Sequence, residues 1–319
     1  MEARTILLLF VACGLVGCRS TYVGNLSRTQ SVSLEQPELP VEEYEEEIQT
    51  NQFSVPETPV EVLNEDKEVL RFSPADALGC SFPIKGGLKS PSPLFIRPGS
   101  RLFYPYSNNG SIEVAVNKSV ELHCTHRFAE PLSGRFYVAT CVGGTKFRID
   151  GRLYDIPSIT CTAWPEFVAN KTGRLCNGGT ALINVGFQLS ANRFLSAYQV
   201  CFNEVEEVTR YVSHRLDAGN NYFQLGIDRI QFLTGGFFGN RNINKLYTQS
   251  TQLQTLNRTL GGGAKKYFDS RRGLFLSRGH MSAKSDFVYA TQQRSTFLFI
   301  NVAPQWQSFN GGNWQKVED

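Results

Sequence analysis

The sequence lacks any apolar run long enough to cross a membrane. No stretch reaches about 18 consecutive apolar residues, whereas a bilayer core about 30 Å thick requires about 20. The apolar run from Ile6 to Val16 follows Arg4 and precedes small residues around Gly17. This arrangement is typical of a cleaved secretory signal. We therefore expect a signal peptide over residues 1–20, no transmembrane helix and no stable membrane association.

A second interpretation of the N-terminus remains open. Leu-Val-Gly-Cys at residues 15–18 also resembles a bacterial lipoprotein cleavage box, which would leave a lipidated Cys18. Five Asn-X-Ser/Thr sequons favour a glycosylating secretory pathway instead. Their asparagines are Asn25, Asn109, Asn117, Asn170 and Asn257. We expect a secreted, extracellular glycoprotein in which some of these sequons are unused.

The cysteines lack metal-binding and redox spacings. No CxxC pair and no mixed Cys and His ligand pattern occurs, which disfavours a structural zinc site. Beyond Cys13 and Cys18, six cysteines remain, and an even number in a secreted chain is typical of a disulfide framework. They are Cys80, Cys124, Cys141, Cys161, Cys176 and Cys201. We expect three disulfides, whose connectivity the sequence leaves open.

Acidic residues are concentrated in one segment. Positions 35–68 hold twelve acidic residues, one lysine and four prolines. Such a segment buries too little apolar surface to offset its ordering entropy, so residues 21–72 are expected to be disordered. Residues 71–319 contain 28 Lys and Arg against 16 Asp and Glu, an excess of 12 positive charges. This basic part favours a polyanionic partner, such as nucleic acid, a heparin-like glycan or an anionic membrane, and the acidic segment could shield it.

Short alternating runs from about residue 76 to 190 predict antiparallel strands. The runs are SRLFYPY, SIEVAVN, SVELHC, RFYVATCV, TKFRIDGRLYDIP and TALINVGFQL. His123 and His126 flank Cys124 in this region and could be metal ligands on a strand. Because no carboxylate or histidine partner is adjacent in sequence, a structural or exposed role is favoured for both.

The next part of the chain mixes strands and a helix. Residues 197–216, AYQVCFNEVEEVTRYVSHRL, predict a strand, a charged turn and a second strand. INKLYTQSTQLQTLNRTL, residues 243–260, has helical character, and Gly261–Gly263 ends it. This glycine run lacks both a following Lys-Ser/Thr and a preceding strand. A flexible connection is therefore favoured over a phosphate-binding loop.

The most specific pattern lies in the last 45 residues. An apolar, strand-like run ends on Arg278, Gly279 and His280. The sequence NVAPQ follows at residues 301–305, and Phe-Asn-x-x-x-Trp-x-x-x-Glu at 309–318. Together these motifs resemble the DNA/RNA non-specific endonuclease family, the ββα-metal (His-Me finger) nucleases that include mitochondrial endonuclease G.

The resemblance covers about residues 195–319, including the two strands predicted at 197–216. The β-rich part before it resembles, more loosely, the N-terminal extension of secreted insect-type members. The resemblance implies an endonuclease that hydrolyses the phosphodiester bonds of DNA and RNA with Mg²⁺, or alternatively Mn²⁺. Because family sites contact the nucleic-acid backbone, base specificity is expected to be slight.

The resemblance also assigns roles to individual residues. His280 would be the general base, which suits a side chain whose unperturbed pKa is about 6.5. Asn310 matches the single direct protein ligand of Mg²⁺, a hard ion that retains several waters. Glu318, expected on nearly the same helical face, would accept hydrogen bonds from waters around the ion. Arg278 would neutralise phosphate charge, and Asn301 would support the site.

Two departures from the family pattern favour a second function class. Ser277 stands where the family usually has aspartate, and a serine can still donate and accept a hydrogen bond. The chain ends at Asp319, where family members continue the metal-bearing helix, so we expect weak or no Mg²⁺-dependent activity from a C-terminally incomplete domain. The alternative function is a catalytically impaired, nuclease-derived protein that binds nucleic acid or another polyanion.

Together these patterns predict an α+β protein. A disulfide-linked, β-rich region at residues 73–194 would precede an endonuclease domain with a mixed antiparallel sheet at 195–319. Within that domain, LFLSRGH would end one strand, FLFINVA would form the next, and FNGGNWQKVE would begin a helix. This order would place His280 and Asn310 on facing elements.

Overall fold

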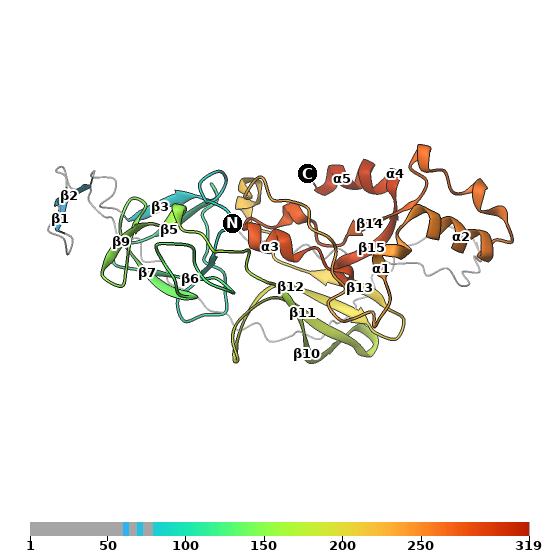
Figure 1. Cartoon of the computed structure of the whole chain (residues 1–319), viewed down its shortest axis with the longest axis horizontal. Helices are drawn as coiled ribbons and strands as arrows, with labels where there is room; N and C mark the ends of the chain where they lie inside the picture. Colours follow the sequence, from blue (N-terminus) through green and yellow to red (C-terminus); the bar gives the residue numbers. More distant parts are fainter. Residues whose placement is uncertain (1–59, 64–68, 73–78, 319) are drawn as a thin grey trace, which may run out of the picture. The chain divides into compact units, whose positions relative to one another are not determined.

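The computed structural model describes residues 60–63, 69–72 and 79–318 (Figure 1). The predicted signal peptide, Asn25 and most of the predicted acidic segment lie outside these residues. Within that segment, β1 (Val60–Leu63) and β2 (Val69–Phe72) pair antiparallel. The Val, Leu and Phe residues of these strands favour extended backbone. Disorder over the rest of residues 21–72 stays a prediction.

The β-rich region that follows contains two antiparallel sheets. One pairs β3 (Cys80–Pro83) with β5 (Ser111–Val114). The other has the order β4 (Leu94–Ile96), β6 (Ser119–His123), β7 (Phe136–Gly143), β8 (Lys146–Ile149) and β9 (Arg152–Asp155). The alternating runs thus form strands as predicted. SRLFYPY at residues 100–106 is the exception, because it forms a loop with a single bridge between Phe103 and Ile96.

A hydrophobic core separate from that of the β-rich region packs against a four-stranded antiparallel sheet. Its order is β10 (Val168–Cys176), β11 (Thr180–Ser190), β12 (Arg193–Asn203) and β13 (Val208–Ser213). The charged turn at residues 204–207 joins β12 to β13, as the sequence predicts. The predicted boundary between residues 194 and 195 falls inside β12, so one continuous sheet crosses it.

Three disulfides confirm the prediction from the six cysteines and supply their pairing. Cys80–Cys141 and Cys124–Cys161 staple the β-rich region to itself. Cys176–Cys201 joins β10 to β12 within the four-stranded sheet. Such bonds are typical of proteins that mature in an oxidising compartment.

The C-terminal part places short helices around a hairpin. The helices are α1 (Ile243–Leu246), α2 (Gln249–Thr259), α3 (Ala290–Ser295), α4 (Gln307–Phe309) and α5 (Gln315–Glu318). The hairpin consists of β14 (Leu276–His280) and β15 (Val302–Trp306). Thr248 caps α2 by accepting a hydrogen bond from the Thr251 amide. Within the described residues, no helix is long and apolar enough to cross a membrane.

The predicted second strand of the hairpin is shorter than expected. FLFINVA was expected to be extended from residue 297, but Phe299–Asn301 is a 3₁₀ turn and β15 begins at Val302. The strand is shortened because the residues before it are buried in succession and not alternately. Residues 297–301 are all buried, and their side chains fill the core beneath β11 to β13, which a flat strand with alternating faces would not do.

Tyr289 links the C-terminal part to the core of the β-rich region. Its ring stacks on Phe95 and Phe103 with centroids 5.9 Å away in both cases, and its edge meets Tyr106. Its hydroxyl donates a hydrogen bond of 2.7 Å to the carbonyl oxygen of Tyr104. A residue between the two hairpin strands is thereby part of the N-terminal core.

Four sequon asparagines lie within the described residues. Asn109, Asn117 and Asn170 are exposed, and Asn257 is half-buried. The Asn257 side chain also accepts a hydrogen bond from the Ala264 amide. Glycosylation stays a prediction.

We predict that Tyr289→Ala lowers the free energy of unfolding by about 3–5 kcal/mol, because it removes a large buried ring. Tyr289→Phe should cost about 1 kcal/mol, since it removes only the hydrogen bond to Tyr104. Urea denaturation measures both changes. Tyr267→Ala is the control, because Tyr267 is exposed and its loss should cost less than about 0.5 kcal/mol. Equal effects of the Tyr289→Ala and Tyr267→Ala substitutions would contradict the central position of Tyr289.

Candidate active site

The β14–β15 hairpin carries the predicted active-site triplet. His280 pairs with Val302, and Arg278 pairs with Pro304. Because successive side chains in a strand point to opposite faces, Arg278 and His280 share one face of the hairpin. Ser277 and Gln305 lie on the other face. The structure therefore brings the predicted arginine and the predicted base together.

His280 is held in an aromatic pocket. His280 is only 5% exposed. The centroid of its ring lies 5.1 Å from the ring centroids of both Phe232 and Phe297. Burial is the main reason that the pKa of His280 falls from 6.5 to about 4, with a smaller contribution from the positive charge of Arg229. The lowered pKa favours the neutral imidazole at pH 7, and its Nε2 is a buried nitrogen without a hydrogen-bond partner among the described protein atoms.

Arg278 packs against the same aromatic group. The guanidinium carbon lies 5.8 Å from the ring centroid of Phe232 and 5.4 Å from that of Tyr247. Such contacts hold the cation in place without neutralising it. Its Nε atom is buried and, among the described residues, has no hydrogen-bond partner. The arginine thus retains hydrogen-bonding capacity for an anion.

Gly279 is required by the side chain that crosses it. A Cβ atom at this position would lie 2.3 Å from both Cδ and Oε1 of Gln305. The glycine between Arg278 and His280 therefore lets the Gln305 side chain lie flat on the strand. Ser277, on the same face, donates a hydrogen bond of 3.1 Å to the Gln305 carbonyl oxygen. This serine joins the two strands and does not face Arg278 or His280.

Asn301 fixes the chain on either side of the His280 loop. Its side chain is completely buried, and its amide oxygen accepts a 2.9 Å hydrogen bond from the Ser282 amide. Its amide nitrogen donates 3.0 Å bonds to the carbonyl oxygens of Ser282 and Thr296. The Asn301 carbonyl accepts from the Met281 amide. The sequence predicted a supporting role for Asn301, and these contacts are consistent with one.

A second group of side chains supports the same loop and was missed by sequence analysis. His214, near the end of β13, lies 2.7 Å from the Ser282 hydroxyl through Nδ1 and 3.2 Å from an Asp286 carboxylate oxygen through Nε2. Asp286 also accepts a hydrogen bond from the Ala283 amide. His214 and Asp286 are 72 residues apart, so no local pattern marks them as partners.

Gln252 anchors helix α2 to the outer edge of the hairpin. Its side-chain oxygen accepts from the Leu276 amide at 2.8 Å, and its nitrogen donates to the Leu276 carbonyl at 2.8 Å. The glutamine amide thus takes the place of a neighbouring strand. Its position on the buried face of an amphipathic helix was the one available sequence signal.

Asn310 and Glu318 lie beyond the other end of the hairpin. The chain leaves β15 at Trp306, opposite Leu276, and the Ser308 amide donates to the Gly273 carbonyl. Asn310 is half-buried, and no described side chain hydrogen-bonds to its amide. Within the described residues, no hydrogen bond joins Asn310 to His280. The arrangement of these two residues on facing elements stays a prediction.

The segment after Asn310 is not a continuous helix. Gly311 (φ −89°, ψ 15°) and Gly312 (φ −123°, ψ −108°) depart from helical angles between Asn310 and α5. The placement of Asn310 and Glu318 on nearly the same helical face stays a prediction. Two adjacent glycines explain the interruption, because glycine gives the backbone freedom and little helical preference.

The residues present fit a hydrated, oxygen-binding metal ion better than a closed metal cage. Within the described part of the chain, no group of three or more His, Cys, Asp or Glu side chains is arranged to hold a metal ion. Mg²⁺ retains waters and needs only one or two protein oxygens. The Asn310 amide oxygen is such a donor. On the hairpin, buried polar atoms without partners occur at Arg278, His280 and Gln305, which is consistent with a site that binds a further polar group.

The two histidines of the β-rich region differ from each other. His123 is buried on β6, and burial, followed by the charge of Arg135, lowers its pKa to about 4. His126 is exposed, and its Nε2 lies 3.0 Å from a Glu166 carboxylate oxygen. A carboxylate partner is thus present, 40 residues along the chain, although the sequence shows none nearby. Among the residues that the structure describes, the two imidazoles do not form a metal site with a third ligand.

Comparison with known proteins gives a consistent result for the C-terminal part. The profile of a family described as DNA/RNA non-specific endonuclease matches residues 178–319. A salivary endonuclease of Lutzomyia longipalpis is 32% identical over 242 residues, which is 75% of this chain and 54% of the relative. No solved structure matches the chain.

Two further relatives are more distant. A salivary endonuclease of Culex quinquefasciatus is 26% identical over 161 residues, covering 50% of this chain and 40% of the relative. Salivary protein Tsal1 of Glossina morsitans morsitans is 21% identical over 175 residues, covering 53% and 43%. The chain therefore spans about half the length of the curated relatives it matches.

We predict that Asn301→Ala lowers the free energy of unfolding by about 3 kcal/mol or more, because it leaves three buried backbone groups without partners. Chemical denaturation measures the loss. Asn313→Ala is the matched control, since Asn313 is exposed in the same C-terminal part and should change stability by less than about 0.5 kcal/mol. A small effect at Asn301 would show that the loop is held by other contacts.

We predict that the His280 imidazole titrates near pH 4, measured by NMR and assigned through the signal lost in His280→Gln. Because an unfolded histidine titrates near 6.5, the unfolded state binds more protons between these values. Stability should thus fall as pH is lowered from 6.5 to 4, and His280→Gln should reduce that fall. His123 contributes in the same direction, so the fall should not vanish. Titration of His280 near 6.5 would contradict its burial.

Proposed function

Because residues 178–319 belong to the DNA/RNA non-specific endonuclease family, we propose that the protein is a secreted, Mg²⁺-dependent endonuclease that hydrolyses phosphodiester bonds of DNA and RNA. The observation that carries this proposal is the Arg-Gly-His strand, where the buried His280 Nε2 has no hydrogen-bond partner among the described residues and His280 shares one face of the hairpin with Arg278. The relatives described as salivary endonucleases support it.

His280 would act as the general base. A neutral imidazole can accept the proton of an attacking water, and its Nε2 has no competing partner among the described residues. Its low pKa keeps it in the basic form down to acidic pH, although it also makes the group a weaker base. Arg278 on the same face would bind a non-bridging phosphate oxygen and offset the charge that develops during attack.

Asn310 would hold the metal ion through its amide oxygen, with Glu318 near the surrounding waters. Bound Mg²⁺ would supply Lewis-acid stabilisation of the departing oxygen. Asn301, His214 and Ser282 would keep the loop after His280 in one conformation, so that the imidazole does not need to be ordered when substrate binds.

The charge of the chain supports a nucleic-acid substrate. Residues 71–319 carry an excess of 12 positive charges, which favours a polyanion. The three disulfides support an extracellular location. Contacts to the sugar-phosphate backbone do not read sequence, so DNA and RNA cleavage with slight base preference is expected.

A second function, nucleic-acid binding without cleavage, is favoured by one observation. His280 is 5% exposed, and the backbone interruption at Gly311 and Gly312 separates Asn310 from the last helix. In this case the site would retain Arg278 and the basic surface but would lack an assembled catalytic group.

We predict that the protein nicks plasmid DNA in Mg²⁺, that EDTA abolishes nicking, and that His280→Ala lowers the rate about 10²–10⁴-fold, as expected for loss of a general base. Gel assays measure the rate, and filter binding in EDTA measures affinity separately. Salt-sensitive binding without any cleavage by the unmodified protein would support the second function instead. Cleavage that persists in His280→Ala at the original rate would remove His280 from the chemistry.

A further inference from the structure

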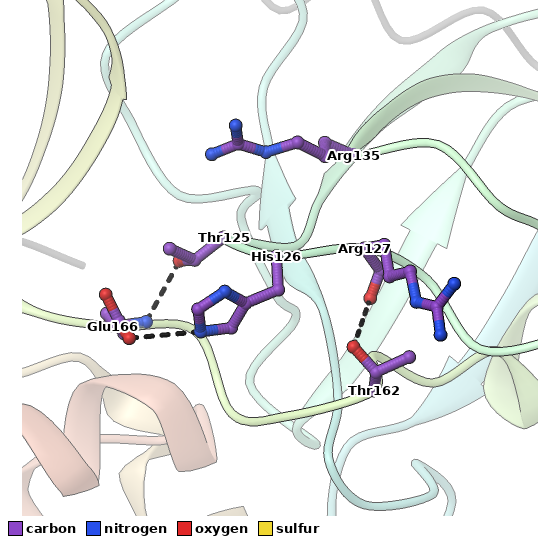
Figure 2. A pocket seen from close by; sticks show the side chains of 6 residues that line it. All are labelled: Thr125, His126, Arg127, Arg135, Thr162 and Glu166. Carbon is purple, nitrogen blue, oxygen red and sulfur yellow. Dashed lines mark hydrogen bonds and ion pairs between the residues drawn. The ribbon is translucent and has the colours of Figure 1, made fainter.

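An open polar pocket lies in the β-rich region, on residues that the nuclease site does not use. It has a volume of about 460 Å³. Thr125, His126, Arg127, Arg135, Thr162 and Glu166 line it (Figure 2). Among the ionisable lining residues, His126 pairs with Glu166 at 3.0 Å. Two arginines therefore remain to set the charge of the pocket.

The pocket is built on a rigid frame. Thr125, His126 and Arg127 directly follow Cys124, and Thr162 directly follows Cys161, so the disulfide between these cysteines fixes both loops. Phe128 bridges to Cys161, and the Thr162 amide and hydroxyl both donate to the Arg127 carbonyl, at 3.0 and 3.1 Å.

The pair of His126 and Glu166 closes one side of this frame. The Glu166 amide donates a hydrogen bond of 2.9 Å to the Thr125 hydroxyl, while the Glu166 carboxylate contacts His126. The backbone and the carboxylate are therefore both held by the opposite loop. A pocket whose walls are already ordered loses little entropy when a ligand binds.

The two arginines are exposed and unneutralised. Neither the Arg127 nor the Arg135 guanidinium has an ion pair or hydrogen bond within the described residues. Figure 2 shows Arg135 above His126 and Arg127 to the right of it, with their guanidinium groups pointing in different directions. Groups that point apart suit an extended polyanion better than a single small anion.

We propose that Arg127 and Arg135, together with the Thr125 hydroxyl, bind successive phosphates of a nucleic-acid strand outside the nuclease site. Arginine suits this task because its planar fork donates two hydrogen bonds to one phosphate. Binding at a second place on the same chain raises the effective concentration of a long substrate at the cleavage site. The choice of nucleic acid over another polyanion rests on the proposed function, whereas the anionic character of the ligand rests on the pocket alone.

The test compares Arg127→Ala/Arg135→Ala with Arg148→Ala/Arg152→Ala in the full chain. Arg148 and Arg152 are exposed on β8 and β9 of the same region and do not line the pocket, so both variants lose the same charge. Fluorescence anisotropy with a 20-nucleotide DNA in EDTA measures Kd. The pocket variant should bind about tenfold more weakly or worse, and its slope of log Kd against log salt should fall by about 1 to 2. The control should change much less.

Glu166→Gln should change the affinity for DNA in the opposite direction. It removes the negative charge from the pocket and should tighten DNA binding, whereas damage to the frame would weaken it. Equal weakening by the two double variants, or weaker binding by Glu166→Gln, would overturn the proposal. Loss of heparin binding with unchanged DNA binding would assign the pocket to a sulfated glycan and also overturn it.

Cleavage of a small chromogenic phosphodiester separates this proposal from the proposed function. Such an ester is too short to reach a second site, so the pocket variant should hydrolyse it at the unmodified rate while it cleaves long DNA more slowly at low substrate concentration. If the unmodified protein hydrolyses neither substrate, the proposed nuclease activity fails, and the binding measurements in EDTA still decide the role of the pocket.

Discussion

The buried amide of Asn301 is the contact on which the candidate site most depends. Its three side-chain hydrogen bonds join Asn301, next to the start of β15, to Ser282 just after β14 and to Thr296 at the end of α3. Backbone groups in a buried loop need partners, and here one side chain supplies them. The 20 residues between His280 and Asn301 can therefore fold back into the core. Tyr289, in the same loop, then carries the connection into the N-terminal region.

Aromatic rings and the positive charge of Arg278 surround the candidate base on the hairpin. Phe232 contacts both His280 and Arg278, so one ring keeps the base neutral by excluding water and steadies the cation beside it. In such surroundings an unpaired polar atom is costly, and three of them occur on two short strands. Native proteins keep such atoms where a ligand completes them. The hairpin therefore combines well-packed aromatic surroundings with polar atoms that lack hydrogen-bond partners among the described residues.

Local patterns in the sequence revealed those features whose cause is local. The alternation in residues 197–216, the glycines after α2 and the Arg-Gly-His strand each act within a few residues, and the structure has the corresponding elements. The partners of side chains far apart in sequence could not be predicted, including His214 with Asp286 and Gln252 with Leu276. Residues 297–301 misled the prediction because an apolar run is compatible with a strand and with a buried turn. The spacing of Asn310 and Glu318 predicted one continuous helix, but Gly311 and Gly312 interrupt it.

The proposed active site has a base and an arginine on the hairpin and a metal ligand on the segment that follows. Mg²⁺ scatters too weakly to identify, but Mn²⁺ binds similar oxygen ligands and gives an anomalous signal. The most direct measurement is therefore anomalous diffraction from crystals of the protein soaked with Mn²⁺. We predict one strong peak at the Asn310 amide oxygen on the side that faces His280. A peak elsewhere, with none at Asn310, would contradict the proposed site.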